Sequence, residues 1–303
     1  MVFYVVYIWV AILNYNTCLN ILLKSKFTIL LFDNGSLRPQ ACLALRALAK
    51  GLSEITGLRV EPVSLLHSHK INAAELEGEP ATIIRRRFKA GIANGEEHFI
   101  CLPLFLGPSL AITDYLQELI EEARALAPSM EIRVAPPLAG WDVSAPDPRL
   151  AEILADQVRS TMDAEQLSAP INLALVDHGS PIEALSILRN RVAEQLQKLL
   201  GEKVYQVHAC SMERRAGDAY AFNDPLLETL NFSDEHALGS DAILLVALFF
   251  LLPGRHAGPG GDVEEILDQM LEAGNINAYF KTDLIGSHPL LYSILSDRLA
   301  SVF

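Results

Sequence analysis

The chain has 303 residues, half of them hydrophobic, and a formal net charge of −13. This length predicts one large domain or two ordinary ones with ample apolar residues for a core. The acidic balance excludes a broad basic surface, so no nucleic-acid partner is expected. The cysteines Cys18, Cys42, Cys101 and Cys210 form no C-x-x-C pair. A disulfide framework or a structural zinc site is therefore not expected, and a reducing cytoplasm fits.

An apolar stretch from Val2 to Leu13 opens the chain. It is only 12 residues long, whereas a membrane-spanning helix needs about 20. A signal peptide would place basic residues before its apolar core, but none precedes Lys24. We predict that residues 1–26 are an apolar extension, from a mis-assigned start or as an added element, and we expect no membrane partner.

The rest of the chain alternates between two patterns. Short apolar runs predict buried strands, and longer segments with apolar residues three and four apart predict helices. In the first half, strands are expected at 27–33, 58–66, 97–104 and 130–136, and helices at 38–56, 80–94, 112–127 and 147–165. In the second half, strands are expected at 171–177, 203–210, 242–250 and 276–284, and helices at 181–200, about 223–231, 262–274 and 288–302. This alternation predicts an α/β fold in which each half is a mostly parallel sheet with helices on both faces.

The two halves resemble each other at three landmarks. The segment 32–36 (FDNGS) matches 176–180 (VDHGS), 144 positions later. The segment 103–108 resembles 247–253, about 145 positions later, and 147–154 resembles 288–295, 141 positions later. A nearly constant offset indicates duplication of a whole domain. We therefore predict tandem domains at 27–168 and 169–303, joined near 166–170.

Three side chains that can bind a metal follow predicted strands of the second half. His178 follows the run 171–176, Glu213 follows 204–212, and His256 lies in a glycine-rich loop after 242–250. Parallel sheets bind ligands outside the carboxyl ends of their strands, and imidazole with carboxylate suits a divalent transition metal. A structural histidine and a solvated Glu213 beside basic neighbours are the alternatives. After His178, a glycine permits a tight turn and Ser180 can cap the next helix.

Together, His178-Gly179-Ser180, Met212-Glu213 and the segment 250–256 (FLLPGRH) resemble the class II tetrapyrrole chelatases, the sirohydrochlorin cobaltochelatases and ferrochelatases of the CbiX and SirB type. The resemblance spans about 27–303 as two fused chelatase-like domains. It implies insertion of Co²⁺ or Fe²⁺ into sirohydrochlorin or a related tetrapyrrole, in cobalamin or siroheme biosynthesis. It implies no ATP and no cofactor beyond the substrate metal. His178, Glu213 and His256 would bind the metal, and the two histidines would accept the pyrrole protons.

Such a substrate carries several carboxylates, which arginine side chains bind well. Arg214, Arg215 and Arg255 flank two of the proposed metal ligands and are the expected substrate-binding cations, with Gly179 and Ser180 beside them. Ordinary surface arginines are the alternative interpretation.

The first half departs from the family pattern. Asn34 stands where His178 stands, His67 stands at the Glu213 position, and the segment 105–111 contains no histidine. We predict that this half has lost catalysis and shapes the cleft. The second half departs too, with a lengthened loop at 257–261 and an insertion at about 216–241.

Two other functions compete with a chelatase. One is a non-catalytic tetrapyrrole- or metal-binding protein derived from a chelatase, favoured by the lost first site. The other is a nucleotide-binding domain, which would need a phosphate loop that the glycines at 254–261 do not form. The sequence leaves the metal and the pathway open. A monomer fits, because two fused halves can form the cleft that two subunits would otherwise form.

Overall fold

The structure is a computed structural model that describes residues 26–230, 232 and 243–303. The predicted extension at 1–26 lies outside the described residues apart from Lys26, and so does the last part of the expected insertion at 216–241. None of the described helices is long and apolar enough to cross a membrane.

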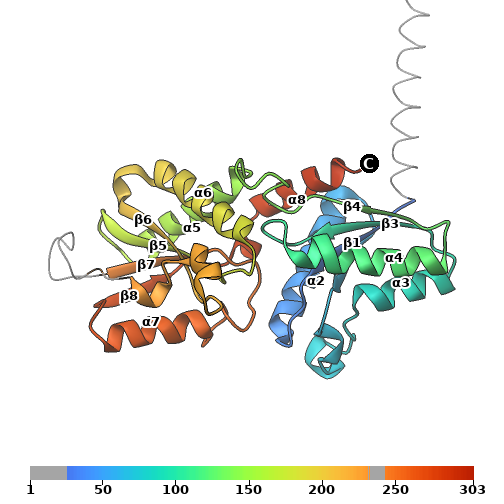
Figure 1. The fold of residues 1–303 in the computed structure, drawn as a ribbon, viewed down its shortest axis with the longest axis horizontal. Coiled ribbons are helices and arrows are strands. Elements are labelled where there is room, and N and C mark those ends of the chain that lie inside the picture. The colour runs from blue at the N-terminus through green and yellow to red at the C-terminus, as the bar shows by residue number, and fades with distance from the viewer. Residues whose placement is uncertain (1–25, 231, 233–242) are drawn as a thin grey trace, which may run out of the picture.

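The described residues form two lobes, each built on a four-stranded parallel sheet (Figure 1). The strand order is β2-β1-β3-β4 in the first sheet and β6-β5-β7-β8 in the second, which is the same order when strands are counted within each half. This confirms the predicted α/β fold with two similar parallel sheets. The strands are β1 (Thr28–Asp33), β2 (Val60–Ser64), β3 (His98–Pro103), β4 (Glu131–Val134), β5 (Ile171–Asp177), β6 (Val204–Ser211), β7 (Ile243–Leu248) and β8 (Ala278–Lys281).

Helices surround both sheets. Side chains of each central strand alternate between two apolar clusters, as the period of a strand requires. Ile29 and Leu31 of β1 join a large core shared by both lobes, whereas Leu30 and Phe32 face a separate cluster under α3 and α4. Leu173 and Leu175 of β5 join the same shared core. The helices are α2 (Pro39–Thr56), α3 (Ile84–Ala93), α4 (Leu116–Leu126), α5 (Arg149–Ala164), α6 (Glu183–Leu200), α7 (Asp262–Glu272) and α8 (Leu290–Ala300).

One expected helix is absent. In place of a helix at about 223–231, the structure has 3₁₀ turns at Asp218–Asn223 and Leu227–Thr229. Pro225 has no N–H for a helical hydrogen bond, and its carbonyl instead accepts a hydrogen bond from Ser211 N at 3.1 Å. The segment therefore runs beside the end of β6, where Ser211 also bridges to Leu226.

The last helix of each half packs against the other half. Helix α5 contacts α6 and β7, and α8 contacts α2 and β3. In Figure 1, α8 lies between the lobes and its end reaches over the first one. Asp147, just before α5, links the two exchanged helices, α5 and α8. Its Oδ2 accepts a hydrogen bond from Arg149 of α5 at 2.7 Å and one from Arg298 of α8 at 2.6 Å. The domains 27–168 and 169–303 stay a prediction, since each exchanged helix packs on the other sheet.

Candidate functional site

The turn after β5 rests on a buried polar network. Asp177 Oδ1 accepts hydrogen bonds from Ser211 Oγ at 2.6 Å and from Gly179 N at 3.1 Å, and it lies 3.5 Å from Arg189 Nη1. Arg189 is fully buried, and its guanidinium also contacts Ser211 Oγ and the carbonyl of Asn223. Burial raises the pKa of Asp177, and the Arg189 charge opposes that rise. The network fixes the end of β5 directly beneath His178.

The side chain of Asn223 holds the turn between β5 and α6 through hydrogen bonds. Its side-chain oxygen accepts hydrogen bonds from Ser180 N at 2.9 Å and Ser186 Oγ at 3.2 Å, and its amide nitrogen donates to Ser180 O at 3.0 Å. Ser180 is buried and its hydroxyl accepts from Ile182 N at 3.1 Å. Helix α6 begins only at Glu183 with Ile182 at its N-cap, so the expectation that Ser180 caps this helix is wrong. It stabilises the turn before the helix instead.

Gly179 allows two strand ends to touch. Its φ is +88°, and a Cβ atom built there would lie 1.9 Å from the carbonyl oxygen of Glu213. Glu213 N in turn donates a hydrogen bond to His178 O at 3.3 Å. Only glycine satisfies both the left-handed backbone and the close approach. As a result, the loops after β5 and β6 present His178 and Glu213 side by side.

The structure brings the three predicted metal ligands together. His178 Nε2 lies 3.4 Å from Glu213 Oε1. The imidazole rings of His178 and His256 lie edge to face, with their centroids 4.3 Å apart. All three side chains remain accessible, with 46% of His178, 60% of Glu213 and 33% of His256 exposed. An incoming metal ion can therefore reach each of them.

The free lone pairs of these side chains fit a metal-binding role. His178 Nδ1 lies 3.0 Å from Gly179 O, and because a carbonyl only accepts, this nitrogen carries the proton. His256 Nδ1 lies 2.6 Å from Asp262 Oδ2 and donates to that carboxylate. Both imidazoles thus keep Nε2 unprotonated when neutral, as a metal ligand or a base requires.

The ligand set is open. Among the residues that the structure describes, no three His, Cys, Asp or Glu side chains already surround one point as a metal site. The contacts of His178 with Glu213 and His256 are pairwise.

The predicted substrate-binding arginines occupy different surroundings. Arg255 is 73% exposed, and its Nε lies 3.5 Å from Asp262 Oδ2, beside His256. Arg214 is bent back onto its own loop, where it pairs with Asp224 at 2.9 Å. The Arg215 guanidinium lies 5.7 Å from the centre of the Tyr220 ring. Arg255 is therefore the freest of the three to meet a ligand.

The first half repeats the backbone of the site without its ligands. Gly35 has a φ of +94°, and a Cβ there would lie 1.8 Å from Leu66 O. Leu66 N donates to Asn34 O at 3.1 Å, as Glu213 N does to His178 O. Asn34 is thus the counterpart of His178, but Leu66 is the counterpart of Glu213. The assignment of His67 to that position is wrong by one residue.

A cavity of about 260 Å³ joins the two halves at the carboxyl ends of their strands. Its walls include Asn34, Phe105 and Ser109 from the first half, and His178 and Ser180 from the second. Most of the remaining wall is leucine and phenylalanine. The first half therefore contributes directly to the space beside His178, as predicted for a half that shapes the cleft.

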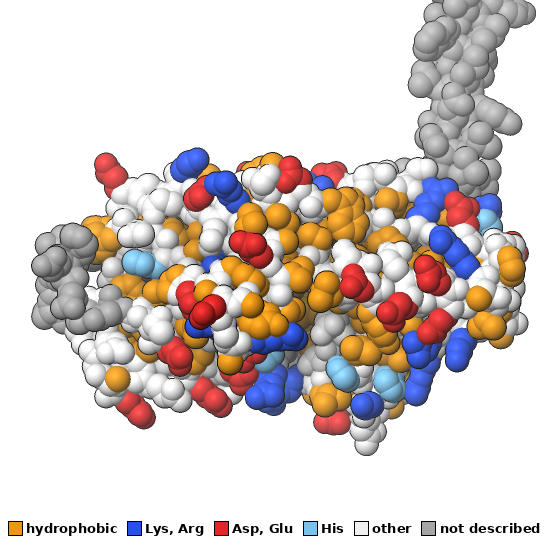
Figure 2. Space-filling model, in the orientation of Figure 1, with side chains coloured by type: hydrophobic (Ala, Val, Ile, Leu, Met, Phe, Trp, Pro, Cys, Tyr) orange, Lys and Arg blue, Asp and Glu red, His pale blue; other side chains and the backbone are white. Residues whose placement is uncertain are grey.

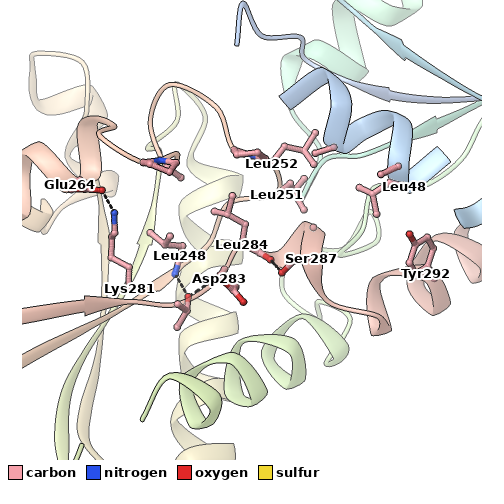
Figure 3. A pocket seen from close by; sticks show the side chains of 17 residues that line it. Leu48, Leu248, Leu251, Leu252, Glu264, Lys281, Asp283, Leu284, Ser287 and Tyr292 are labelled. Atoms are coloured by element: carbon pink, nitrogen blue, oxygen red, sulfur yellow. Dashed lines mark hydrogen bonds and ion pairs between the residues drawn. The ribbon is translucent and has the colours of Figure 1, made fainter. Parts of the chain in front are cut away.

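A second cavity, of about 530 Å³, lies on the other side of Leu251, which lines both. Figure 3 shows Leu48 of α2 and Tyr292 of α8 approaching it from one end and the ion pair between Glu264 and Lys281 at the other. Pro253, Ala257 and Pro259 also line it, so the loop that carries His256 forms part of its wall. On the face of the molecule in Figure 2, acidic side chains are scattered over both lobes.

Sequence reasoning missed the residues that support the ligands. Arg189 lies on the buried face of α6 with Ser186, Val192 and Leu196, so an arginine at an apolar helical spacing was a usable signal. Asn223 gave no signal, because its role depends on a turn that was expected to be helical. Asp262 was expected only as the first residue of the helix at 262–274, whereas its side chain binds His256.

The protein resembles known proteins in its structure but not detectably in its sequence. No protein-family model and no curated protein matches the sequence. Among solved structures, SirB from Bacillus subtilis with Fe³⁺ has a TM-score of 0.61 at 18% identity, covering 91% of this chain and 94% of that one. The sirohydrochlorin chelatase SirB from Bacillus subtilis subspecies spizizenii in complex with cobalt has a TM-score of 0.60 at 20% identity, with the same coverage.

A multi-domain protein from Deinococcus radiodurans, described as structurally similar to chelatases, has a TM-score of 0.59 at 16% identity, covering 91% of this chain and 55% of that one. This chain has the fold of the class II chelatases. The chelatase fold extends over both lobes, which confirms the resemblance expected from the strand-end motifs. Identities this low establish the fold and leave the activity to the chemistry of the site.

Proposed function

We propose that the protein is a metallochelatase that inserts Co²⁺ or Fe²⁺ into sirohydrochlorin or a related tetrapyrrole. The observation that carries the proposal is the contact of His178 with both Glu213 and His256 at the carboxyl ends of β5, β6 and β7. The SirB structures with iron and with cobalt share the fold. Imidazole and carboxylate ligands suit both metals.

The reaction needs a metal site that holds its ion only briefly. The macrocycle gains the metal and loses two pyrrole N–H protons, so the protein must deliver an ion and accept protons. His178 and His256 each keep Nε2 free for both tasks. Glu213 neutralises part of the ion's charge and completes the ligand set. An open set suits this role, because an ion held in a closed site would be slow to leave.

Asp262 supports His256 through the hydrogen bond at 2.6 Å. Such a carboxylate fixes the ring orientation and the tautomer of a metal-binding histidine and makes the imidazole a better ligand. The same aspartate lies 3.5 Å from Arg255 Nε. We propose that Arg255, with Arg214 and Arg215, binds carboxylate arms of the macrocycle, while Gly179 and Ser180 shape its place beside His178.

No cofactor beyond the substrate metal is proposed, and ATP is not required. We propose that the protein acts as a monomer, because both halves of one chain line the cavity beside His178. Cys42, Cys101 and Cys210 are buried free thiols, and we propose a cytoplasmic location on the basis of these reduced cysteines. The product would serve siroheme or cobalamin synthesis, according to the metal.

One observation favours the alternative of a non-catalytic tetrapyrrole- or metal-binding protein, namely that the three ligands do not yet converge. Absorbance spectroscopy of sirohydrochlorin mixed with Co²⁺ distinguishes the two functions. A chelatase accelerates the spectral change of metal insertion above the rate without protein. A binding protein shifts the spectrum of the tetrapyrrole on mixing but leaves the insertion rate unchanged.

A further inference from the structure

The first half lacks the metal ligands, yet it contributes polar atoms to the cavity beside His178. Asn34 occupies the position equivalent to that of His178 and lines the same cavity. Ser109, in the loop after β3, lines it too. The two halves therefore meet across one space, with an imidazole on one side and an amide and a hydroxyl on the other.

Ser109 has an unused hydrogen-bonding group. Its Oγ is buried and has no hydrogen-bond partner among the residues that the structure describes, which costs free energy unless a ligand supplies one. Its backbone carbonyl is already occupied, since it accepts from Ile112 N at 2.9 Å and Thr113 N at 3.0 Å. The hydroxyl is thus the part of Ser109 that remains for a ligand.

The Asn34 side chain is similarly available. Its backbone carbonyl accepts from Leu66 N at 3.1 Å, but within the described part of the chain its exposed amide makes no hydrogen bond. The amide can donate two hydrogen bonds and the Ser109 hydroxyl one. On the opposite wall, Ser180 N is already used by Asn223.

The size of the cavity limits what can enter. A volume of about 260 Å³ corresponds to roughly nine water molecules at about 30 Å³ each. That is too small for a whole tetrapyrrole with its arms, but it admits one edge of the macrocycle and one substituent. The apolar wall, including Phe105 and Leu188, suits the pyrrole edge. The end of a carboxylate arm would then need donors, and Ser109 and Asn34 have them.

We propose that Asn34 and Ser109 are positioning residues that hold one carboxylate arm of the macrocycle, so that the first half acts as the substrate-orienting half of a single site. The inference rests on the proposed chelatase function. Neutral donors hold the arm here, whereas Arg255, which is not among the residues that line this cavity, would bind another arm. Fixing one edge of the ring in the cavity places its centre beside His178, where the metal is delivered.

Titration of sirohydrochlorin without metal, followed by absorbance or fluorescence, tests the inference. Asn34→Ala and Ser109→Ala are each expected to raise the Kd about tenfold, the effect of losing one hydrogen bond to a charged group. Ser109→Thr keeps the hydroxyl and should remain near the wild-type affinity. With the fully esterified tetrapyrrole the difference between the wild type and the alanine variants should be much smaller, because an ester carbonyl accepts a weaker hydrogen bond than a carboxylate does.

Matched controls are Asn94→Ala, at the opposite edge of the first sheet, and Ser160→Ala, on the exposed face of α5. Both should bind as the wild type does. At saturating substrate, the alanine variants at 34 and 109 should insert Co²⁺ at close to the wild-type kcat with a raised KM. A loss confined to kcat would contradict a positioning role.

The outcomes separate this inference from the function on which it rests. If the wild type inserts metal and the double variant Asn34→Ala/Ser109→Ala binds sirohydrochlorin as tightly as the wild type, the positioning role is wrong and the chelatase stands. If the wild type neither binds sirohydrochlorin nor accelerates insertion, the proposed function fails and this inference fails with it.

Discussion

Asp262 Oδ2 lies 2.6 Å from His256 Nδ1, and the two residues stand at either end of the glycine-rich loop before α7. The loop is folded so that Asp262, the first residue of the helix, holds His256, the proposed metal ligand. Val263 N also donates to His256 O at 3.1 Å, so backbone and side chain fix the same residue. His256 is therefore oriented before any metal arrives.

Replacing Asp262 tests this orientation. Asp262→Ala should lower the rate of metal insertion by about 10- to 100-fold, as loss of a carboxylate behind a metal-binding histidine does. Tetrapyrrole binding should change much less. The control is Glu265→Ala in the same helical turn, where the side chain does not contact His256. Equal insertion rates for Asp262→Ala and the wild type would show that His256 needs no such support.

Gly179→Ala tests the contact between the loops after β5 and β6. A methyl group at this position meets Glu213 O at 1.9 Å and should push Glu213 away from His178. We expect loss of insertion by at least tenfold, measured with the stability of the variant by thermal unfolding. Gly140→Ala is the control, because it has the same φ of +88° with nothing within 4 Å of the new methyl. If the two variants lose activity equally, backbone strain and not the clash is responsible.

Arg189→Met removes the buried cation of the network below His178. Asp177 would keep its hydrogen bonds to Ser211 and Gly179 but lose its paired cation, at a cost of about 3–5 kcal/mol in the free energy of unfolding. Urea unfolding measures this. Arg191→Met is the matched control on the same helix, since Arg191 is 49% exposed and pairs with Glu194 at the surface, where a pair contributes about 0–1 kcal/mol. Similar losses in both variants would contradict the role given to Arg189.

Asp33, the counterpart of Asp177, has no such cation beside it in the part of the chain that the structure describes, and it should make stability depend on pH. Burial raises its pKa from 3.8 to about 6, and its Oδ1 is buried without a partner. Between about pH 4 and 6 the folded protein holds this proton more tightly than the unfolded chain, so the contribution to stability falls as pH rises, by about 3 kcal/mol in all. Above pH 6 it stays lost.

Asp33→Asn should therefore stabilise the protein at pH 8 relative to the wild type, and by only about a third as much at pH 4.5. Denaturant unfolding at the two pH values measures the difference, with the exposed Asp163→Asn as control. A stability difference between Asp33→Asn and the wild type that is the same at both pH values would show that Asp33 does not titrate in this range.

Much of the fold could be predicted from the sequence because the signals were local. Each of the expected strands at 27–33 and 171–177 is a short apolar run, and the repeat of FDNGS as VDHGS fixed their equivalence. The proximity of His178, Glu213 and His256 followed from the rule that parallel strands end at one edge of the sheet. The exchange of α5 and α8 could not be predicted, because an apolar helix face does not reveal which sheet it covers.

The roles of Asp262 and Arg189 could not be predicted from the sequence for a similar reason. The contact of Asp262 with His256 depends on how a loop of glycines folds, and that of Arg189 with Asp177 joins a helix to a strand end. Neither is a local property of the sequence. The one-residue error at Leu66 arose because a histidine next to the true position looked like a better counterpart for Glu213.

The most direct test of the account is the rate of Co²⁺ or Fe²⁺ insertion into sirohydrochlorin, followed by absorbance, for the wild type and for His178→Ala and His256→Ala. The account predicts acceleration by the wild type, its loss in both variants, and tetrapyrrole binding that both variants retain. Insertion by both variants at the wild-type rate would contradict the assignment of the site. Tight tetrapyrrole binding without acceleration by the wild type would contradict the chelatase itself.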